Sequence, residues 1–232
     1  MKKSLKFFVV AFTAIFVFSA FSVTEIKAQV MNKFLSRMEA HRKRLVTLKA
    51  KIEMAKYNSQ LDSDDDLTEG KIIYVAGKSE REIYVRLDWI KPEESLSIVK
   101  DAYTLYRPRL KQVYIGKVDK AKNSAKAGNA LSFMNMSSAQ LKKNFTFTLL
   151  SENERVKNGT STVHIELTPK IKTNYKTAEV WIDTDGMPIQ IKVTEHNNDS
   201  TTILLSNLVK NEQIDVKVLT VEYPSTIKPI KN

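Results

Sequence analysis

The chain consists largely of short segments in which apolar and polar residues alternate, and turn signals separate these segments. Alternation with a period of two is the pattern of a strand with one buried and one solvated face. Asn158-Gly159 and Asp185-Gly186 each lie between two such segments, as in β-hairpins with tight turns. We therefore predict an antiparallel meander, with strands at residues 48–54, 72–75, 83–89, 96–100, 103–106, 112–117, 145–150, 162–168, 178–183, 188–195, 201–208 and 214–222.

A sheet of this size with one apolar face needs a second layer to cover that face. Helical patterns at residues 31–46 and near 131–143 supply this layer. The second pattern is rich in methionine, which suits a surface that repacks around variable ligands, and it is equally compatible with a permanent cap on the core. The sequence thus predicts an α+β fold, mainly β, with helices across the concave face of a curved antiparallel sheet.

Residues 1–28 have the three parts of a secretory signal. A basic start with three lysines precedes an apolar run at residues 7–18, which is short for a membrane span, and Ala28 precedes the predicted cleavage site. An uncleaved N-terminal anchor is the alternative. We predict a single domain at residues 29–232 that is exported to the periplasm and is soluble. Because the chain contains no cysteine, it has no residue for lipid attachment.

The net charge of +11 raises the question of a nucleic-acid partner. Residues 1–28 hold four lysines and one glutamate, so their removal leaves +8. The remaining lysines occur along the whole chain, mostly at alternate strand positions, which is typical of a solvated sheet face. An exported chain also meets little nucleic acid. We therefore expect no nucleic-acid partner, whereas a mildly cationic surface near anionic lipid headgroups fits the sequence.

Residues that usually carry catalysis or bind metals are sparse. The histidines His41, His164 and His196 lie far apart in the sequence, and His41 is expected to be exposed within a basic helix. Zinc needs three or four ligands in a suitable frame, which this sequence lacks. The motif G-x-S-x-G is absent, and Asp183 and Asp185 fit a hairpin turn better than a pair of catalytic carboxylates. The sequence predicts no catalytic residues, no metal and no cofactor, and therefore a binding protein.

Residues 85–113 carry an ordered set of aromatic, proline and turn positions. In order, these are Trp89, Lys91-Pro92, Ile98-Val99, Asp101-Ala102, Tyr103-x-Leu105-Tyr106, Pro108 and Gln112-Val113. This order resembles that of the LolA-type lipoprotein carriers, which have a glycine at the position of Ala102. The resemblance extends over residues 31–230, with further matching segments at Leu167-Thr168-Pro169-Lys170, Glu179–Pro188, Leu205-Ser206-Asn207 and Tyr223-Pro224.

The resemblance implies an incomplete β-barrel of about 11–12 strands, closed by a helical lid over a hydrophobic cavity. It also implies a non-enzymatic, monomeric periplasmic carrier that binds the acyl chains of lipoproteins and ferries them from the inner to the outer membrane. The implied partners are acylated lipoproteins or lipids, an inner-membrane lipoprotein-releasing transporter and an outer-membrane acceptor. The alternative on the same fold is a shuttle for lipids or glycolipids, or a module that senses acyl chains during envelope stress.

The resemblance also indicates which residues bind the acyl chain. Many relatives tie the lid to the barrel through an arginine six residues before the tryptophan, where this chain has Ile83. Arg81 lies two residues away on the same strand face and is the predicted latch. The alternative is that the apolar residues are plain core. The predicted acyl-binding residues are Ile52, Met54, Ile83, Val85, Leu87, Trp89, Phe133 and Met134.

Overall fold

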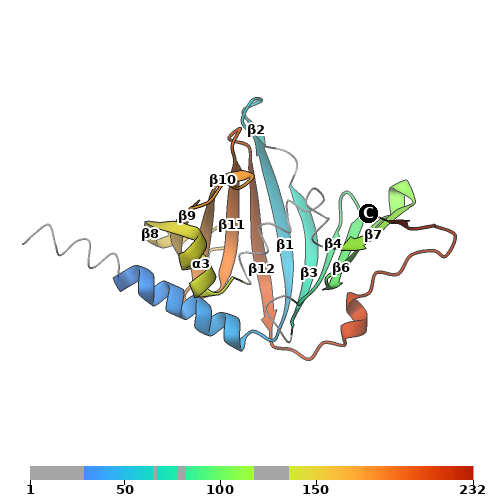
Figure 1. Ribbon diagram of the computed structural model, residues 1–232, viewed down its shortest axis with the longest axis horizontal. Coiled ribbons are helices and arrows are strands. Elements are labelled where there is room, and N and C mark those ends of the chain that lie inside the picture. The colour runs from blue at the N-terminus through green and yellow to red at the C-terminus, as the bar shows by residue number, and fades with distance from the viewer. Residues whose placement is uncertain (1–28, 65–66, 78–81, 118–135, 232) are drawn as a thin grey trace, which may run out of the picture.

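One curved sheet dominates the computed structural model, which describes residues 29–64, 67–77, 82–117 and 136–231 (Figure 1). Its strands follow the order β13-β7-β6-β5-β4-β3-β1-β12-β11-β10-β9-β8, and β2 pairs with β1. The strands are β1 (Thr47–Asn58), β2 (Ser63–Asp64), β3 (Thr68–Ala76), β4 (Ile83–Trp89), β5 (Glu94–Lys100), β6 (Ala102–Arg107), β7 (Gln112–Lys117), β8 (Phe145–Arg155), β9 (Ser161–Pro169), β10 (Tyr175–Asp183), β11 (Pro188–Glu195), β12 (Ser200–Lys210) and β13 (Ile230–Lys231).

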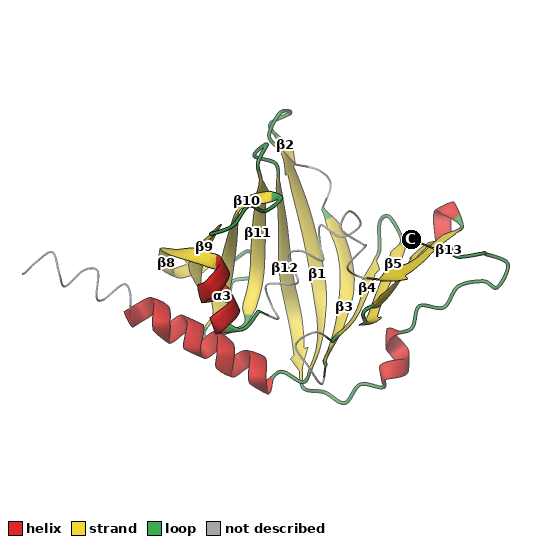
Figure 2. Ribbon diagram, in the orientation of Figure 1, coloured by secondary structure: helices red, strands yellow, loops and turns green. Residues whose placement is uncertain are grey.

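The sheet curves without closing, because its end strands β8 and β13 each pair with only one neighbour among the described residues (Figure 2). All of its pairings are antiparallel except that of β13 with β7. The predicted fold class is confirmed: the protein is mainly β, with an open antiparallel sheet that forms an incomplete barrel. The two strands that the sequence did not predict, β2 and β13, are two residues long and show no alternation.

The long strand β1 joins the two halves of the sheet. Its residues Leu48, Ala50 and Ile52 are buried, whereas Lys49 and Lys51 between them are partly exposed, as the alternation predicts. On one side β1 pairs with β3, the next long strand in the sequence, and on the other with β12, about 150 residues later. The meanders β3–β7 and β8–β12 are therefore held in one sheet by a single strand.

Two helices lie together at one end of strands β8–β12 (Figure 1). The N-terminal helix spans residues 29–44, close to the predicted 31–46. The second, α3 (Ser138–Asn144), begins with a serine cap: the hydroxyl of Ser137 accepts from the backbone N–H of Gln140, whose side-chain oxygen accepts from the backbone N–H of Ser137. Leu141 of α3 and Phe34 and Leu35 of the N-terminal helix are buried in the main core.

Gly186 fixes the position of the N-terminal helix on the sheet. It has a φ of +92° in the tight turn between β10 and β11, where its N–H donates to the carbonyl of Asp183. A Cβ atom at this position would lie 2.5 Å from the backbone carbonyl of Arg37 in the helix. Because glycine has no Cβ atom, Gly186 permits both the positive φ of the turn and the close approach of the helix.

The C-terminal segment does not form the strand predicted at residues 214–222, which is a correction to the sequence analysis. Asp215 instead caps a short 3-10 helix, η3 (Val216–Leu219). Arg86 of β4 donates hydrogen bonds to the backbone carbonyls of Val218 and Thr220, each at 2.9 Å. The alternation failed here because the segment packs on the outside of the sheet through Leu219, which is fully buried, and forms no pairs with it.

Within residues 29–64, 67–77, 82–117 and 136–231, no helix has the length and apolar character needed to cross a bilayer.

Replacement of Gly186 by alanine should destabilise the fold more than replacement of Gly159, which makes a matched control. Gly159 also has a positive φ (+83°), but a Cβ atom there would meet nothing within 4 Å. Gly159→Ala should therefore cost about 1–2 kcal/mol of backbone strain, and Gly186→Ala should add the cost of displacing the helix. Urea unfolding of both variants measures the difference. Equal losses of stability would mean that the helix does not depend on this contact.

Candidate functional site: the apolar inner face and its helical cover

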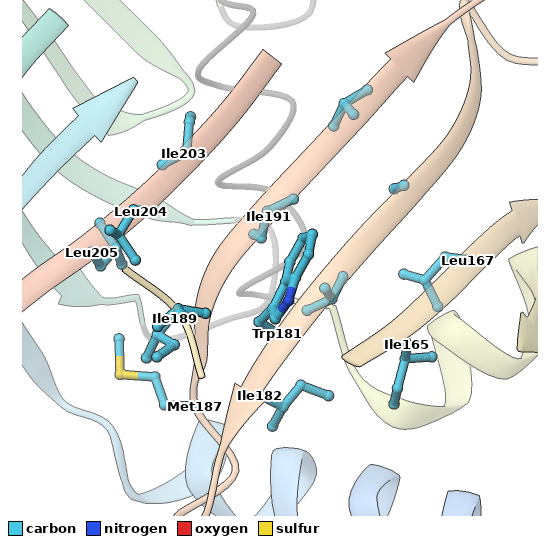
Figure 3. Close-up of a cluster of buried hydrophobic side chains, with 14 of the residues drawn as sticks. Ile165, Leu167, Trp181, Ile182, Met187, Ile189, Ile191, Ile203, Leu204 and Leu205 are labelled. Carbon is cyan, nitrogen blue, oxygen red and sulfur yellow. The ribbon is translucent and has the colours of Figure 1, made fainter. Parts of the chain in front are cut away.

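An apolar surface runs across most of the sheet on one face, which we call the inner face. Its side chains follow one another from strand to strand in register, so that they form continuous rows across the sheet. Figure 3 shows part of this surface, including Ile165, Ile191 and Ile203. One row contains Leu149, Ile165, Val180, Ile191, Ile203 and Met54, and another contains Ala50, Ile72, Leu87, Leu96, Leu105 and Tyr114.

Three of the predicted acyl-binding residues, Ile52, Val85 and Leu87, are buried on the inner face, with exposed fractions of 0%, 7% and 1%. Met54 and Trp89 are partly buried and pack against the same core. These residues share one face, as predicted, but their role in binding stays a prediction.

Trp89 owes its position to a glycine on the neighbouring strand. Gly70 of β3 lies between Trp89 and Ile52 in the same row of the sheet. A Cβ atom at Gly70 would lie 2.9 Å from the indole ring of Trp89, so the ring covers the glycine. The absence of a side chain at Gly70 thus lets Trp89 lie toward the centre of the inner face.

The other predicted residues are described only in part. Ile83 pairs with Lys100 through the backbone of β4 and β5, and its side chain is not described. Phe133, Met134 and the predicted latch Arg81 lie outside the described residues. The described residues reveal a different set of polar contacts between the N-terminal helix and the sheet.

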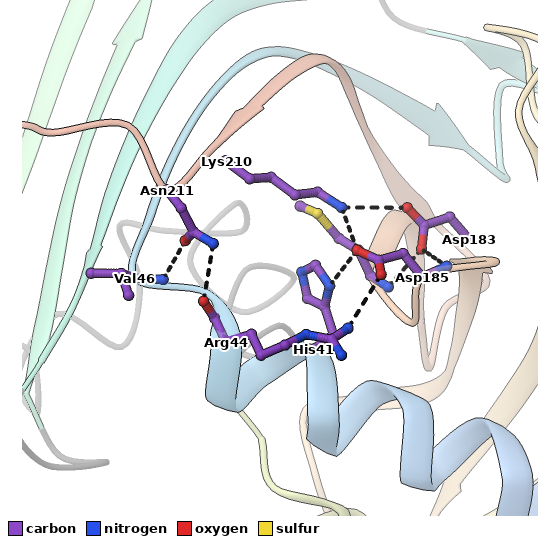
Figure 4. Close-up of polar contacts among 8 residues, drawn as sticks. His41, Arg44, Val46, Asp183, Asp185, Lys210 and Asn211 are labelled. Atoms are coloured by element: carbon purple, nitrogen blue, oxygen red, sulfur yellow. Dashed lines mark hydrogen bonds and ion pairs between the residues drawn. The ribbon is translucent and has the colours of Figure 1, made fainter.

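These contacts converge on Asp185 in the β10–β11 turn (Figure 4). From the helix, the Nδ1 atom of His41 lies 3.0 Å from Oδ2 of Asp185, and the guanidinium of Arg44 donates to Oδ1 at 3.2 Å. From β12, the ammonium of Lys210 lies 3.1 Å from Oδ2 of Asp185 and 3.8 Å from Asp183. The hydrogen bond from Lys210 is the main cause that lowers the pKa of Asp185, so this carboxylate remains ionised as the common anchor.

His41 is 5% exposed, so the prediction that it is exposed is wrong. The cause is the turn at Asp185, which packs against the polar side of the helix and covers the imidazole. Burial lowers the pKa of His41, and the positive charge of Lys210 adds to this effect, whereas the hydrogen bond to Asp185 opposes it. Its Nε2 atom is buried without a hydrogen-bond partner. The imidazole is therefore neutral in the docked helix.

Glu39 connects the N-terminal helix to α3. Its carboxylate accepts from the guanidinium of Arg42 at 2.8 Å and from the backbone N–H of Ser138, in the first turn of α3, at 3.0 Å. The hydrogen bond with Arg42 lowers the pKa of Glu39 to about 2, against the opposing effect of burial. The two helices therefore form one polar-linked unit at the end of the sheet.

His164 belongs to a separate cluster on the opposite, outer face of the sheet. Its imidazole stacks on Trp181 at 3.9 Å between ring centroids, while Nδ1 lies 2.8 Å from Glu154 and Nε2 lies 2.9 Å from Glu179. Burial alone would lower the pKa of His164, but the hydrogen bonds to Glu179 and Glu154 outweigh burial and raise it. With both nitrogens engaged by carboxylates, neither is available to take a proton from a nucleophile.

The described residues contain no group of three or more His, Cys, Asp or Glu side chains placed to hold a metal ion.

No local signal in the sequence reveals the contacts at Asp185. Asp185 and Gly186 form a dipeptide that is typical of an ordinary hairpin turn, and His41 lies in a basic segment of the helix. The two residues are separated by 144 positions, so only the packing of the helix on the turn brings them together.

The comparisons with known proteins agree with this architecture. The model of the family described as outer membrane lipoprotein carrier protein LolA matches residues 80–221, which is more than half of the chain. The chain belongs to the LolA family. A search of the curated proteins finds no match.

Solved structures of similar fold are distant in sequence. An uncharacterized conserved protein from Thermus thermophilus is 10% identical with a TM-score of 0.54, and the match covers 88% of this chain and 99% of that chain. The crystal structure of MucB is 14% identical with a TM-score of 0.52, and the match covers 82% of this chain and 62% of that one. At these identities, the likeness extends to the fold alone.

Acidification should loosen the N-terminal helix through His41. The undocked helix has a histidine with an ordinary pKa near 6.5, whereas the docked helix has a lowered one, so docking weakens as the pH falls below about 6.5. Hydrogen exchange of residues 29–44, expressed as protection factors, should show a several-fold loss between about pH 7.5 and about pH 5.5.

His41→Asn is the matched variant, because the amide keeps a donor for Asp185 and does not titrate. Its helix should lose no protection over the same range. His164 affects the pH dependence of stability in the opposite direction. Because its pKa is raised in the folded protein, the stability that it contributes is present below about pH 6.5 and is lost as the pH rises. Equal losses of protection in the wild type and in His41→Asn would exclude His41 as the cause.

Proposed function

We propose that the protein is a periplasmic carrier that binds the acyl chains of lipoproteins against the inner face of its sheet, under the N-terminal helix and α3. Residues 29–232 act as one domain after removal of the signal at residues 1–28. The protein works as a monomer and without catalysis. It receives acylated lipoproteins from an inner-membrane transporter and delivers them to the outer membrane, to an acceptor where one exists.

The observation that carries this proposal is the unbroken apolar inner face. Rows of aliphatic side chains cross the sheet from β8 to β6, and most of them are buried in one hydrophobic core. An acyl chain of about 16 carbons buried there gains about 12 kcal/mol in gross transfer free energy, at ~0.8 kcal/mol per CH₂.

A carrier must also release what it binds, and the form of the cover supports this. The N-terminal helix is held to the sheet in part by the contacts of His41 and Arg44 with Asp185, which is half-exposed. These polar contacts near solvent contribute modestly to stability, so the cost of separating the helix from the sheet comes mainly from exposing Phe34 and Leu35. Opening of the helix then offsets part of the gain from acyl burial and lets the cargo leave.

Trp89 provides a direct test of where an acyl chain binds. The chain has two tryptophans: Trp89 on the inner face and Trp181 on the outer face. A fatty acyl probe brominated along its chain quenches a tryptophan that it contacts. We expect quenching in the wild type, and its loss in Trp89→Phe, in which Trp181 is the remaining tryptophan.

The same titration contains its own control, because Trp181 stacks on His164 away from the inner face. Unchanged quenching in Trp89→Phe would place the acyl chain beside Trp181 and contradict the proposal. Absence of quenching in the wild type, together with no uptake of the probe, would mean that the inner face is a filled core.

A further inference from the structure

The edge of the sheet at β8 combines an open groove with unpaired positive charge. The groove has a volume of about 520 Å³. Its apolar side is formed by residues of the N-terminal helix and β8, and lysines stand at its rim. The lining residues are Met31, Lys142, Phe145, Thr146, Phe147, Thr148, Leu149 and Lys170. Since Leu149 belongs to a row of the inner face, the inner face opens to solvent at this edge.

The rim lysines are held in place by neutral partners. The ammonium of Lys142 donates to the side-chain oxygen of Asn32 at 3.0 Å, and that of Lys170 donates to the backbone carbonyl of Lys142 at 2.7 Å. These contacts bring the N-terminal helix, α3 and the end of β9 together. Their charges are not neutralised by these contacts, because neither acceptor is a carboxylate.

Five exposed lysines lie at or within two residues of Asn32, Lys142 and Lys170 in the sequence, and we call them with Ile171 the basic edge. Across the described residues, none of the five lies within ion-pair distance of a carboxylate, whereas Lys49, Lys51 and Lys157 elsewhere each pair with a glutamate. Ile171, between two of these lysines, is 68% exposed. The basic edge consists of Lys33, Lys142, Lys143, Lys170, Ile171 and Lys172.

We propose that the basic edge docks the protein on a bilayer that contains anionic phospholipid. The lysines contact headgroup phosphates, and Ile171 enters the interface between headgroups and acyl chains. The groove beside it then connects the bilayer with the inner face. The route for acyl cargo rests on the proposed function, whereas the docking itself does not.

Charge complementarity and the apolar side chain together favour a bilayer over an acidic protein. Unpaired lysines attract any anion, but a large exposed aliphatic side chain between two lysines matches the boundary at which phosphates meet hydrocarbon. The groove provides a second reason, because its apolar side leads from this boundary to the face proposed for acyl chains.

Flotation with vesicles tests the docking. The purified protein should float with vesicles of phosphatidylcholine and phosphatidylglycerol and fail to float with phosphatidylcholine alone. Lys142→Glu/Lys170→Glu should weaken binding by roughly tenfold or more, since each lysine near an anionic surface contributes on the order of tenfold or less to binding. Ile171→Ser, which keeps the charge, should weaken binding several-fold.

A matched control separates local docking from net charge. Lys228 and Lys231 are exposed near the end of the chain, where β13 pairs with β7 at the other end of the sheet. Lys228→Glu/Lys231→Glu makes the same change in net charge and should leave vesicle binding within about twofold of the wild type. Equal losses in both double variants, or no binding of the wild type to anionic vesicles, would overturn the proposal.

The acyl-probe titration distinguishes failure of docking from failure of the proposed function. Ile171→Ser, at a residue outside the groove lining, should quench normally with the brominated probe in the absence of vesicles, because the inner face is intact. If the wild type binds anionic vesicles but takes up no probe, the docking surface stands and the carrier function falls. If the wild type takes up the probe but does not bind anionic vesicles, the carrier function stands and the docking surface falls.

Discussion

The pairing of β1 with both β3 and β12 is the constraint on which the rest of the structure depends. Without it, the meanders β3–β7 and β8–β12 would be two separate sheets, and each would expose an apolar face too large for its own cover. Because β1 follows directly on the N-terminal helix, the same strand also delivers that helix to the end of the sheet. The inner face and its cover are therefore consequences of one long-range pairing.

The two faces of the sheet are stabilised in different ways. The inner face depends on aliphatic packing and keeps its polar contacts at the margin, where Asp185 receives His41, Arg44 and Lys210. The outer face carries the buried polar cluster of His164, and Arg86 there binds the carbonyls of the C-terminal segment. Most polar side chains thus lie on the outer face or at the margins, and the rows across the inner face are mainly aliphatic, as an acyl ligand requires.

Much of the fold could be predicted from the sequence because strand alternation is a local property. Strands β7 and β11 have the predicted bounds. The segment at residues 214–222 misled the prediction because its apolar residues alternate like those of a strand, while distant contacts with Arg86 give it a helical turn. Alternation of apolar and polar residues indicates that a segment is amphipathic, but the conformation of that segment depends on its contacts with the rest of the fold.

The candidate site could likewise be predicted only in part from the sequence. The shared face of Val85, Leu87 and Trp89 followed from alternation, and Ile52 joined it through the predicted strand β1. The burial of His41 did not follow, because it depends on a turn far away in the sequence. Polar contacts between elements that are far apart in the sequence produce no periodic pattern. The sequence therefore indicated an apolar binding face but not the contacts that hold the N-terminal helix against the sheet.

The central claim is that the inner face holds an acyl ligand. Native mass spectrometry of the protein purified from the periplasm, followed by extraction and identification of lipid, tests it most directly. The account predicts that acylated peptide or lipid co-purifies in stoichiometric amount, and in a smaller amount with Asp185→Ala, which removes the polar contacts between the helix and the sheet. A protein that is free of ligand when isolated under these conditions, and that takes up no acyl probe afterwards, would contradict it.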